Sequence, residues 1–136
     1  MGLDQFAYRV KKGFIKKPVD FQTEKYNEET QEHEVLTDKK ELHYWRKHPY
    51  LQGWMSELYY EKGGESSEFN CVNVQLTWED LETLEEDIKT GKLPDTCGFF
   101  FGDDSSEEYK EEDLGFVEEA LTAIRKGYDV YYSSWW

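Results

Sequence analysis

Cysteine is nearly absent from the sequence, and long apolar runs are missing from it. The 136 residues include 2 cysteines, Cys71 and Cys97, which are too few for a disulfide framework. No apolar run approaches the length of a membrane-spanning helix, about 18 residues or more. The start, MGLDQFAYRVKKGF, lacks the order of basic, apolar and small residues that marks a signal peptide. We therefore expect a cytoplasmic protein that does not insert into a membrane.

Positive charge is also scarce. Lys and Arg number 16 and Asp and Glu number 30, which gives a formal net charge of −14. Such an excess of carboxylates disfavours direct binding to nucleic acid or to anionic lipid. The imbalance is uneven, because residues 1–50 carry 10 basic and 9 acidic side chains, whereas residues 51–136 carry 6 and 21. An anionic ligand is therefore expected to meet the first part of the chain.

The motifs of several common chemistries are missing as well. The sequence has no GxGxxG or Walker-type phosphate loop and no GxSxG nucleophile turn. It has no HExxH motif and no paired cysteines. His43 and His48 are five positions apart, so on a helix they would point about 140° apart and could not share a metal ion. We expect no metal site and no cofactor.

Aromatic residues are abundant, with 10 Tyr, 8 Phe and 5 Trp making up 17% of the chain. A chain with so many large apolar side chains can bury a core, and its length suits a single domain over residues 1–136. Alternating apolar positions predict strands, and apolar positions three and four apart predict helices. The expected strands cover 3–10, 69–76, 98–101 and 128–136, and the expected helices cover 38–47, 51–59, 77–91 and 114–124.

The order of these elements predicts an α/β fold, with α+β as the alternative. Strand, two helices, strand, helix, strand, helix and strand would form a two-layer sandwich, with a three- or four-stranded sheet and about four helices. The acidic stretch 20–38 has few apolar side chains and is expected to be a mobile excursion between the first strand and the first helix. The sequence leaves open whether the sheet is parallel or mixed.

The densest group of chemically useful side chains lies in LHYWRKHPYLQGWM, residues 42–55. Aromatic rings stack on a flat ligand, while Arg and His donate hydrogen bonds to an anionic group. We therefore expect a pocket for a nucleotide-like small molecule. Its expected lining residues are Tyr8, Arg9, His43, Tyr44, Trp45, Arg46, His48, Trp54 and Trp135. The structural alternative is that Trp45 and Trp54 are ordinary core residues and that the His and Arg side chains cap helix ends.

Two further functions are open from the residues alone. Rows of carboxylates one turn apart on a helix can imitate the phosphates of DNA and bind a host protein; the candidates are Glu79, Glu82, Glu86, Glu118 and Glu119. A small nucleotide-processing enzyme would need His43 or His48 as general base. Cys71 falls among strand residues and is expected to be an inert core cysteine. The aromatic C-terminal segment YYSSWW is suited to a groove wall or to the seam of a homo-oligomer.

Several strings occur together in one order: MGLDQFAYR, ELHYWRKHPYLQGWM, FNCVNVQLTWEDLETLEEDIKTGKLP, GFFFG and VYYSSWW. In these the chain resembles a family of short proteins from tailed bacteriophages and prophage-bearing bacteria, often labelled "phosphoglycerate kinase". The resemblance implies a small phage-type accessory protein in the bacterial cytoplasm, which binds a metabolite or signal and counters host defence. The kinase label is not supported by the residues, because that enzyme is a much larger two-domain protein and no nucleotide loop is present.

Overall fold

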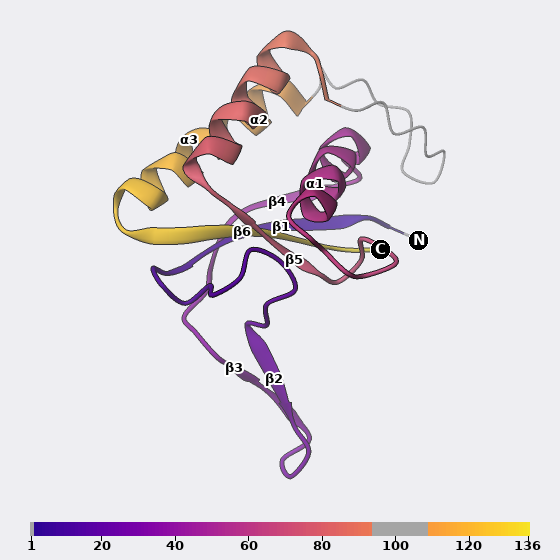
Figure 1. Cartoon of the computed structure of the whole chain (residues 1–136), viewed down its shortest axis with the longest axis vertical. Coiled ribbons are helices and arrows are strands. Elements are labelled where there is room, and N and C mark those ends of the chain that lie inside the picture. Colours follow the sequence, from indigo (N-terminus) through magenta and orange to yellow (C-terminus); the bar gives the residue numbers. More distant parts are fainter. Residues whose placement is uncertain (1, 94–108) are drawn as a thin grey trace.

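The computed structural model describes residues 2–93 and 109–136 (Figure 1). Three helices and two antiparallel sheets are found in this part of the chain. The elements are β1 (Asp4–Lys11), β2 (Glu24–Asn27), β3 (Glu32–Val35), β4 (Lys40–Arg46), α1 (Pro49–Glu61), β5 (Asn73–Leu76), α2 (Trp78–Thr90), α3 (Lys110–Arg125) and β6 (Tyr128–Trp135). None of the helices described here is long and apolar enough to cross a membrane.

The main sheet has four strands in the order β4-β1-β6-β5, and every neighbouring pair is antiparallel. The first and last strands of the chain, β1 and β6, form its centre and pair along their full length, from Asp4 opposite Trp135 to Lys11 opposite Tyr128. The two central strands are rich in aromatic and β-branched residues, which suit a pleated sheet buried on one or both faces.

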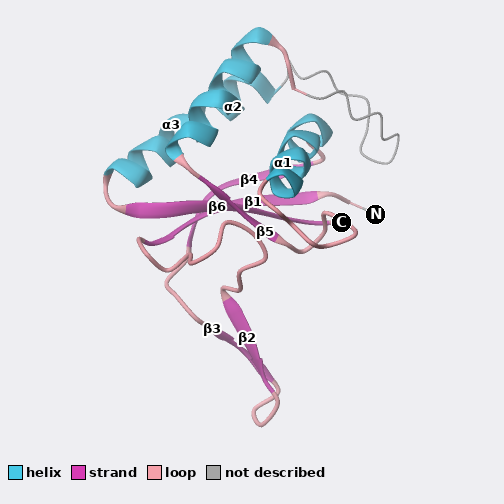
Figure 2. Ribbon diagram, viewed as in Figure 1, coloured by secondary structure: helices cyan, strands magenta, loops and turns pink. Residues whose placement is uncertain are grey.

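All three helices pack on one face of this sheet, and the β2–β3 hairpin projects from the other side (Figure 2). The core lies between the helices and the sheet. It is made of Ala7, Trp45, Leu51, Met55, Val74, Leu81, Leu84, Phe116, Val117, Val130 and Tyr132, among others. The two-layer arrangement of helices on a four-stranded sheet is confirmed. Because the sheet is wholly antiparallel, the architecture is the α+β alternative.

The two edges of the main sheet differ. Beside β5 the chain from Pro18 to Asp20 adds backbone hydrogen bonds, from Asp20 N–H to the Asn73 carbonyl (3.1 Å) and from Gln75 N–H to the Pro18 carbonyl (2.8 Å). Beside β4, no strand in residues 2–93 and 109–136 pairs with its outer edge. One edge is therefore covered by this chain, whereas the other has no strand partner among the described residues.

Three of the four predicted helices are confirmed. In α2, Asp80 N–H donates to Thr77 Oγ1 (3.2 Å) and Thr77 N–H donates to Asp80 Oδ2 (2.9 Å), which is the expected capping box. Gly91 ends the same helix at φ 71°. The predicted helices 51–59 and 114–124 correspond to α1 and α3. The first and last predicted strands correspond to β1 and β6.

The helix predicted over 38–47 is wrong, because those residues form strand β4. Leu42 and Trp45 have helical spacing, but pairing with β1 buries Trp45 and leaves Tyr44 on the opposite face. The predicted loop 20–38 contains the hairpin β2–β3, in which Tyr26 pairs with His33. Mobility of this stretch stays a prediction.

The strand predicted over 69–76 is shorter in the structure, where β5 begins at Asn73. Cys71 has φ 59°, a left-handed conformation that interrupts an extended chain. The same turn exposes Cys71, so the prediction of a core cysteine is wrong. The predicted strand 98–101 lies outside the described residues.

Candidate ligand-binding groove

The face of the sheet opposite the helices carries a groove with aromatic walls. In β1 and β6 the side chains of Ala7, Val130 and Tyr132 point into the helical core, so the intervening residues point the other way. Part of this second face is covered by the segment before β2, and the space between has a volume of about 340 Å³. We call this space the aromatic groove; its rings are Phe6, Tyr8, Phe21, Tyr131 and Trp135.

The rings of the aromatic groove form a nearly continuous row. Tyr8 stacks on Tyr131 with ring centroids 5.2 Å apart, and Phe6 stacks on Tyr8 at 6.0 Å. Phe21 meets Tyr131 edge-on at 5.2 Å. Trp135 lies at one end and is 63% exposed, a large exposed area for a tryptophan on a strand. Tyr131 is only 1% exposed, so the rings that are accessible to a flat ligand are those of Trp135 and the partly buried Phe6, Tyr8 and Phe21.

The remaining groove residues are mostly uncharged and polar. Gln22, Thr23, Asn73 and Ser133 supply amide and hydroxyl groups, which both donate and accept hydrogen bonds. Two charged side chains line it, Lys39 and Glu24, and they form an ion pair of 3.0 Å. The Lys39 Nζ atom also lies 4.8 Å above the ring of Tyr8. The groove therefore combines ring stacking, hydrogen bonding and one cation.

The two tyrosines at the centre of the groove are held in their neutral form. Burial raises the pKa of Tyr8, and the carboxylates of Glu41 and Glu24 raise it further. Burial also raises the pKa of Tyr131, against the hydrogen bond to Thr23 Oγ1 (3.3 Å). Both hydroxyls are therefore protonated at neutral pH and act as neutral hydrogen-bonding groups.

A second polar group lies on the helical side of the sheet and is fully buried. His48 Nε2 and Asp113 Oδ2 are 2.6 Å apart, and these side chains are 0% and 1% exposed. Trp45 Nε1–H donates to the other carboxylate oxygen of Asp113 at 2.9 Å. The ring of Tyr109 stacks on His48 at 3.9 Å. Within the described residues, His48 Nδ1 has no hydrogen-bond partner.

Glutamines connect this buried pair to the centre of the sheet. Gln5 accepts a hydrogen bond from His48 N–H (2.8 Å) and donates to the Tyr132 hydroxyl (2.8 Å). Tyr132 in turn donates to Gln52 Oε1 (2.6 Å), and Gln52 donates to Ser134 Oγ (2.9 Å). The network joins β1, α1, α3 and β6 and fixes how the helices sit on the sheet.

The nine side chains expected to line one pocket are divided among several places. Tyr8 and Trp135 line the aromatic groove, and Tyr44 flanks it, with its ring 5.2 Å from Phe6. Trp45 and Trp54 are buried on the helical side, as the structural alternative anticipated. His48 is buried there too, at the N-cap position of α1, but its side chain makes no capping hydrogen bond. Trp45 and His48 share Asp113 as a partner, whereas Trp54 Nε1 donates to Asp87 Oδ2 (2.9 Å).

The three remaining members of the expected pocket also lie apart. Arg9 stacks over the ring of Tyr128 at 4.1 Å, and His43 Nε2 lies 2.7 Å from Glu112 Oε1. Arg46, at the end of β4, is exposed. Because residues 40–46 form a strand, neighbouring residues point to opposite faces of the sheet, which separates the group.

The groove contains residues that we did not expect from the sequence, namely Phe6, Phe21, Lys39 and Tyr131. The alternation of aromatic residues in QFAY and DVYYSSW would have placed Phe6, Tyr8, Tyr131 and Trp135 on one face once β1 and β6 were paired. Phe21 and Lys39 carried no such signal, because they come from the segments that flank the hairpin.

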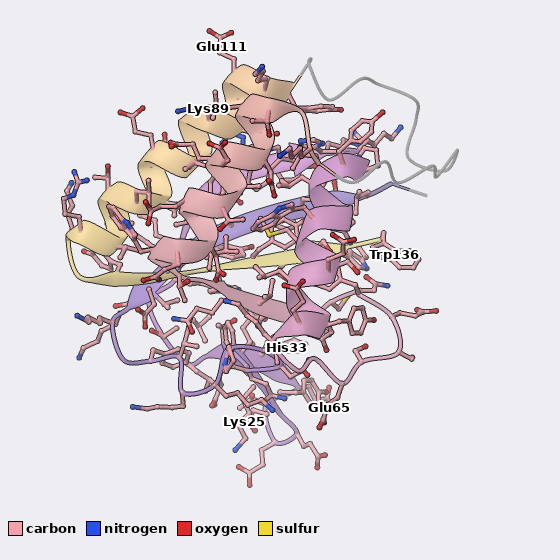
Figure 3. All side chains as sticks on the ribbon, turned by 45° about the horizontal axis from the view of Figure 1, so that its top comes forward. Lys25, His33, Glu65, Lys89, Glu111 and Trp136 are labelled. Atoms are coloured by element: carbon pink, nitrogen blue, oxygen red, sulfur yellow. The ribbon has the colours of Figure 1, made fainter. Side chains whose placement is uncertain are left out.

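The carboxylates proposed as a partner surface lie where helical spacing predicts. Glu79, Glu82 and Glu86 are exposed on α2, and Glu118 and Glu119 are exposed on α3. Figure 3 shows the helical side, with Lys89 of α2 and Glu111 of α3, far from Lys25 and His33 of the hairpin. In residues 2–93 and 109–136, no group of three or more His, Cys, Asp or Glu side chains is arranged to hold a metal ion.

Comparison of the chain with known protein families, with curated proteins and with solved structures finds no match.

Proposed function

We propose that the protein binds a nucleotide-like small molecule with its flat ring in the aromatic groove. The observation that carries this proposal is the row of rings along a space of about 340 Å³ on the sheet face opposite the helices. Pockets for small molecules are usually mostly apolar and aromatic, with a few polar groups that fix orientation, and begin at about 300 Å³. The volume suits one ring system with a sugar-sized attachment.

The polar lining supports a heterocycle over a hydrocarbon ring. Asn73 and Gln22 present amide groups, which can pair with the edge of a nucleobase, and Ser133 presents a hydroxyl. Lys39 is the one groove cation among the described residues, and its partner Glu24 is exposed. A single phosphate could displace that carboxylate from Lys39. The predicted ligand therefore carries a base and at most one phosphate.

Binding without turnover is the simpler function for this site. The His48–Asp113 pair lies in the core on the opposite side of the sheet from the groove, and His43 is paired with Glu112 at α3. A general base must lie within hydrogen-bond reach of the proton that it removes. Sequestration of a metabolite or signal agrees with the accessory role that the phage resemblance implies.

The test is titration with AMP and with adenosine, followed by calorimetry or by native mass spectrometry. We expect AMP to bind. Trp135→Ala should weaken its binding by about tenfold, because loss of one stacked ring costs about 1–3 kcal/mol. Lys39→Ala should weaken the binding of AMP more than the binding of adenosine. Trp78→Ala is the matched control, since Trp78 lies at the start of α2 and stacks with Arg125. Equal effects of Trp135→Ala and Trp78→Ala, or no binding by any nucleoside or nucleotide, would refute the proposal.

The exposed thiol of Cys71 provides an independent readout, because Cys71 also lines the groove. In a Cys97→Ser background, a maleimide reacts with Cys71 alone. A ligand in the groove should slow this reaction in proportion to its occupancy. Unchanged labelling at saturating AMP would place the nucleotide elsewhere.

A further inference from the structure

A second groove lies on the other side of the sheet, between β4 and α3. It has a volume of about 620 Å³, and its apolar part is formed by Leu42, Gly115 and Ala123. We call it the β4–α3 groove. Gly115 lies inside α3, and a Cβ atom placed on it would meet no atom within 4 Å. Glycine within a helix is destabilising relative to alanine, and packing inside the chain does not explain this open notch.

The walls of the β4–α3 groove run antiparallel to each other. Near one end, His43 of β4 meets Glu112 at the start of α3. At the other end, Lys40 at the start of β4 and Lys126 just after α3 line the same space. One wall of the groove is β4, which is also the edge strand of the main sheet and has no pairing partner on its outer side among the described residues.

Three cations gather at the second end of this groove: Arg9, Lys40 and Lys126. In residues 2–93 and 109–136, none of them has a carboxylate within ion-pair distance, although the chain carries a net charge of −14. Arg9 and Lys40 are direct partners across β1 and β4. Like charges opposite each other on adjacent strands are destabilising, and an anion bound between them would remove this cost.

Carboxylates line the rest of the groove, at Glu41, Glu118 and Glu119. They disfavour a ligand that is anionic along its whole length, such as a polyphosphate or a nucleic acid. The groove therefore fits an occupant that is extended and apolar over Leu42 and Ala123 and carries its negative charge at one end. A peptide with a free C-terminal carboxylate has this distribution.

From these contacts we infer that the β4–α3 groove binds the extended C-terminal segment of a partner polypeptide, which adds to β4 as a further antiparallel strand. The carboxylate would lie at Arg9, Lys40 and Lys126, beside the start of β4, so the peptide runs opposite to β4. Every pair in the sheet is already antiparallel. Backbone hydrogen bonds supply the affinity in such strand addition, and alternate side chains enter the groove.

The probe is an acetylated hexapeptide of alternating valine and threonine with a free C-terminal carboxylate, and its control is the same peptide with a C-terminal amide. We expect the acid to bind about tenfold more tightly than the amide, because only the free carboxylate forms charge-assisted hydrogen bonds. A tenfold difference corresponds to about 1.4 kcal/mol. Binding should slow hydrogen exchange at the outward amides of β4. Lys40→Ala and Lys126→Ala should each weaken binding of the acid several-fold and leave binding of the amide unchanged. Lys89→Ala, which changes an exposed lysine of α2, should alter the binding of neither peptide.

The inference fails if acid and amide bind equally, or if the peptide slows exchange elsewhere in the chain but not at β4. If inorganic phosphate binds at Arg9 and Lys40 and the peptide does not compete with it, the inference is wrong and the cations form a simple anion site. Slow exchange of the β4 edge in a dimer formed without peptide would assign that edge to a second copy of the chain. These results are independent of nucleotide binding, because the aromatic groove shares no lining residue with the β4–α3 groove.

Discussion

Removal of the Asp113 carboxylate should destabilise the protein more than a change at any exposed carboxylate. Asp113 accepts hydrogen bonds from Trp45 Nε1 (2.9 Å) and pairs with His48 Nε2 (2.6 Å), and its side chain is 1% exposed. Asp113→Ala leaves both partners buried without an acceptor. Each buried group left unsatisfied costs about 1–3 kcal/mol, and two such groups remain in this variant. We expect a loss of about 3–5 kcal/mol in the free energy of unfolding.

The assay is urea unfolding followed by tryptophan fluorescence, with Glu79→Ala as the control for an exposed carboxylate. The double variant His48→Leu with Asp113→Leu separates the loss of pairing from the loss of the charges. It should recover part of the stability, because no imidazole is then left buried without its partner, although Trp45 still loses its acceptor. If Asp113→Ala lowers stability by less than about 0.5 kcal/mol, the range of an ordinary surface substitution, the buried pair does not hold α3 on the sheet.

Two glycines and two tyrosines give further predictions. Gly64→Ala should destabilise the fold by about 1–3 kcal/mol, because the new Cβ would lie 2.2 Å from Tyr59 Cε2; Gly115→Ala, with open space at its Cβ, should instead stabilise by about 0.5–1 kcal/mol. Thermal unfolding of the two variants checks both signs, and a shift in the same direction would contradict the packing argument. Burial raises the pKa of Tyr131 and of Tyr132 in the folded protein. Stability should therefore be unaffected by these groups below about pH 10 and fall above it, by about 1.4 kcal/mol per pH unit for each tyrosine, as the unfolded chain loses protons first. Tyrosinate absorbance should show these two hydroxyls ionising together with unfolding, and ionisation at the ordinary pH in a folded protein would count against their burial.

Sequence patterns predicted the elements whose signals are local. The apolar stripe of α2 and the capping pair Thr77 and Asp80 need no information from the rest of the chain, and both are found as expected. The strand-forming residues of β1 and the tyrosines of β6 likewise predicted two strands. Residues 40–46 could not be predicted in this way, because Leu42 and Trp45 fit a helix as well as a strand. Only pairing with β1, a distant contact, decides in favour of the strand.

The candidate site was harder to predict than the fold. The candidate residues are close together in the sequence, at 42–55. In the structure this stretch is divided between β4 and α1, so Tyr44, Trp45 and His48 lie in different environments. The aromatic groove is instead assembled from both ends of the chain and from Phe21, which lies in neither central strand. No window of the sequence contains these residues together, so a composition argument finds aromatic abundance but not the groove.

The pairing of β1 with β6 has a consequence for synthesis. β1 leaves the ribosome first among the described elements, and its central partner leaves last, with Asp4 opposite Trp135. Until β6 is made, β1 can pair only with β4, and β5 has no neighbour in the main sheet. The main sheet is therefore completed only after its last strand has been translated, when β6 inserts between β1 and β5. Such a late, long-range step is slow in folding and leaves aromatic strand edges exposed to chaperones in the meantime.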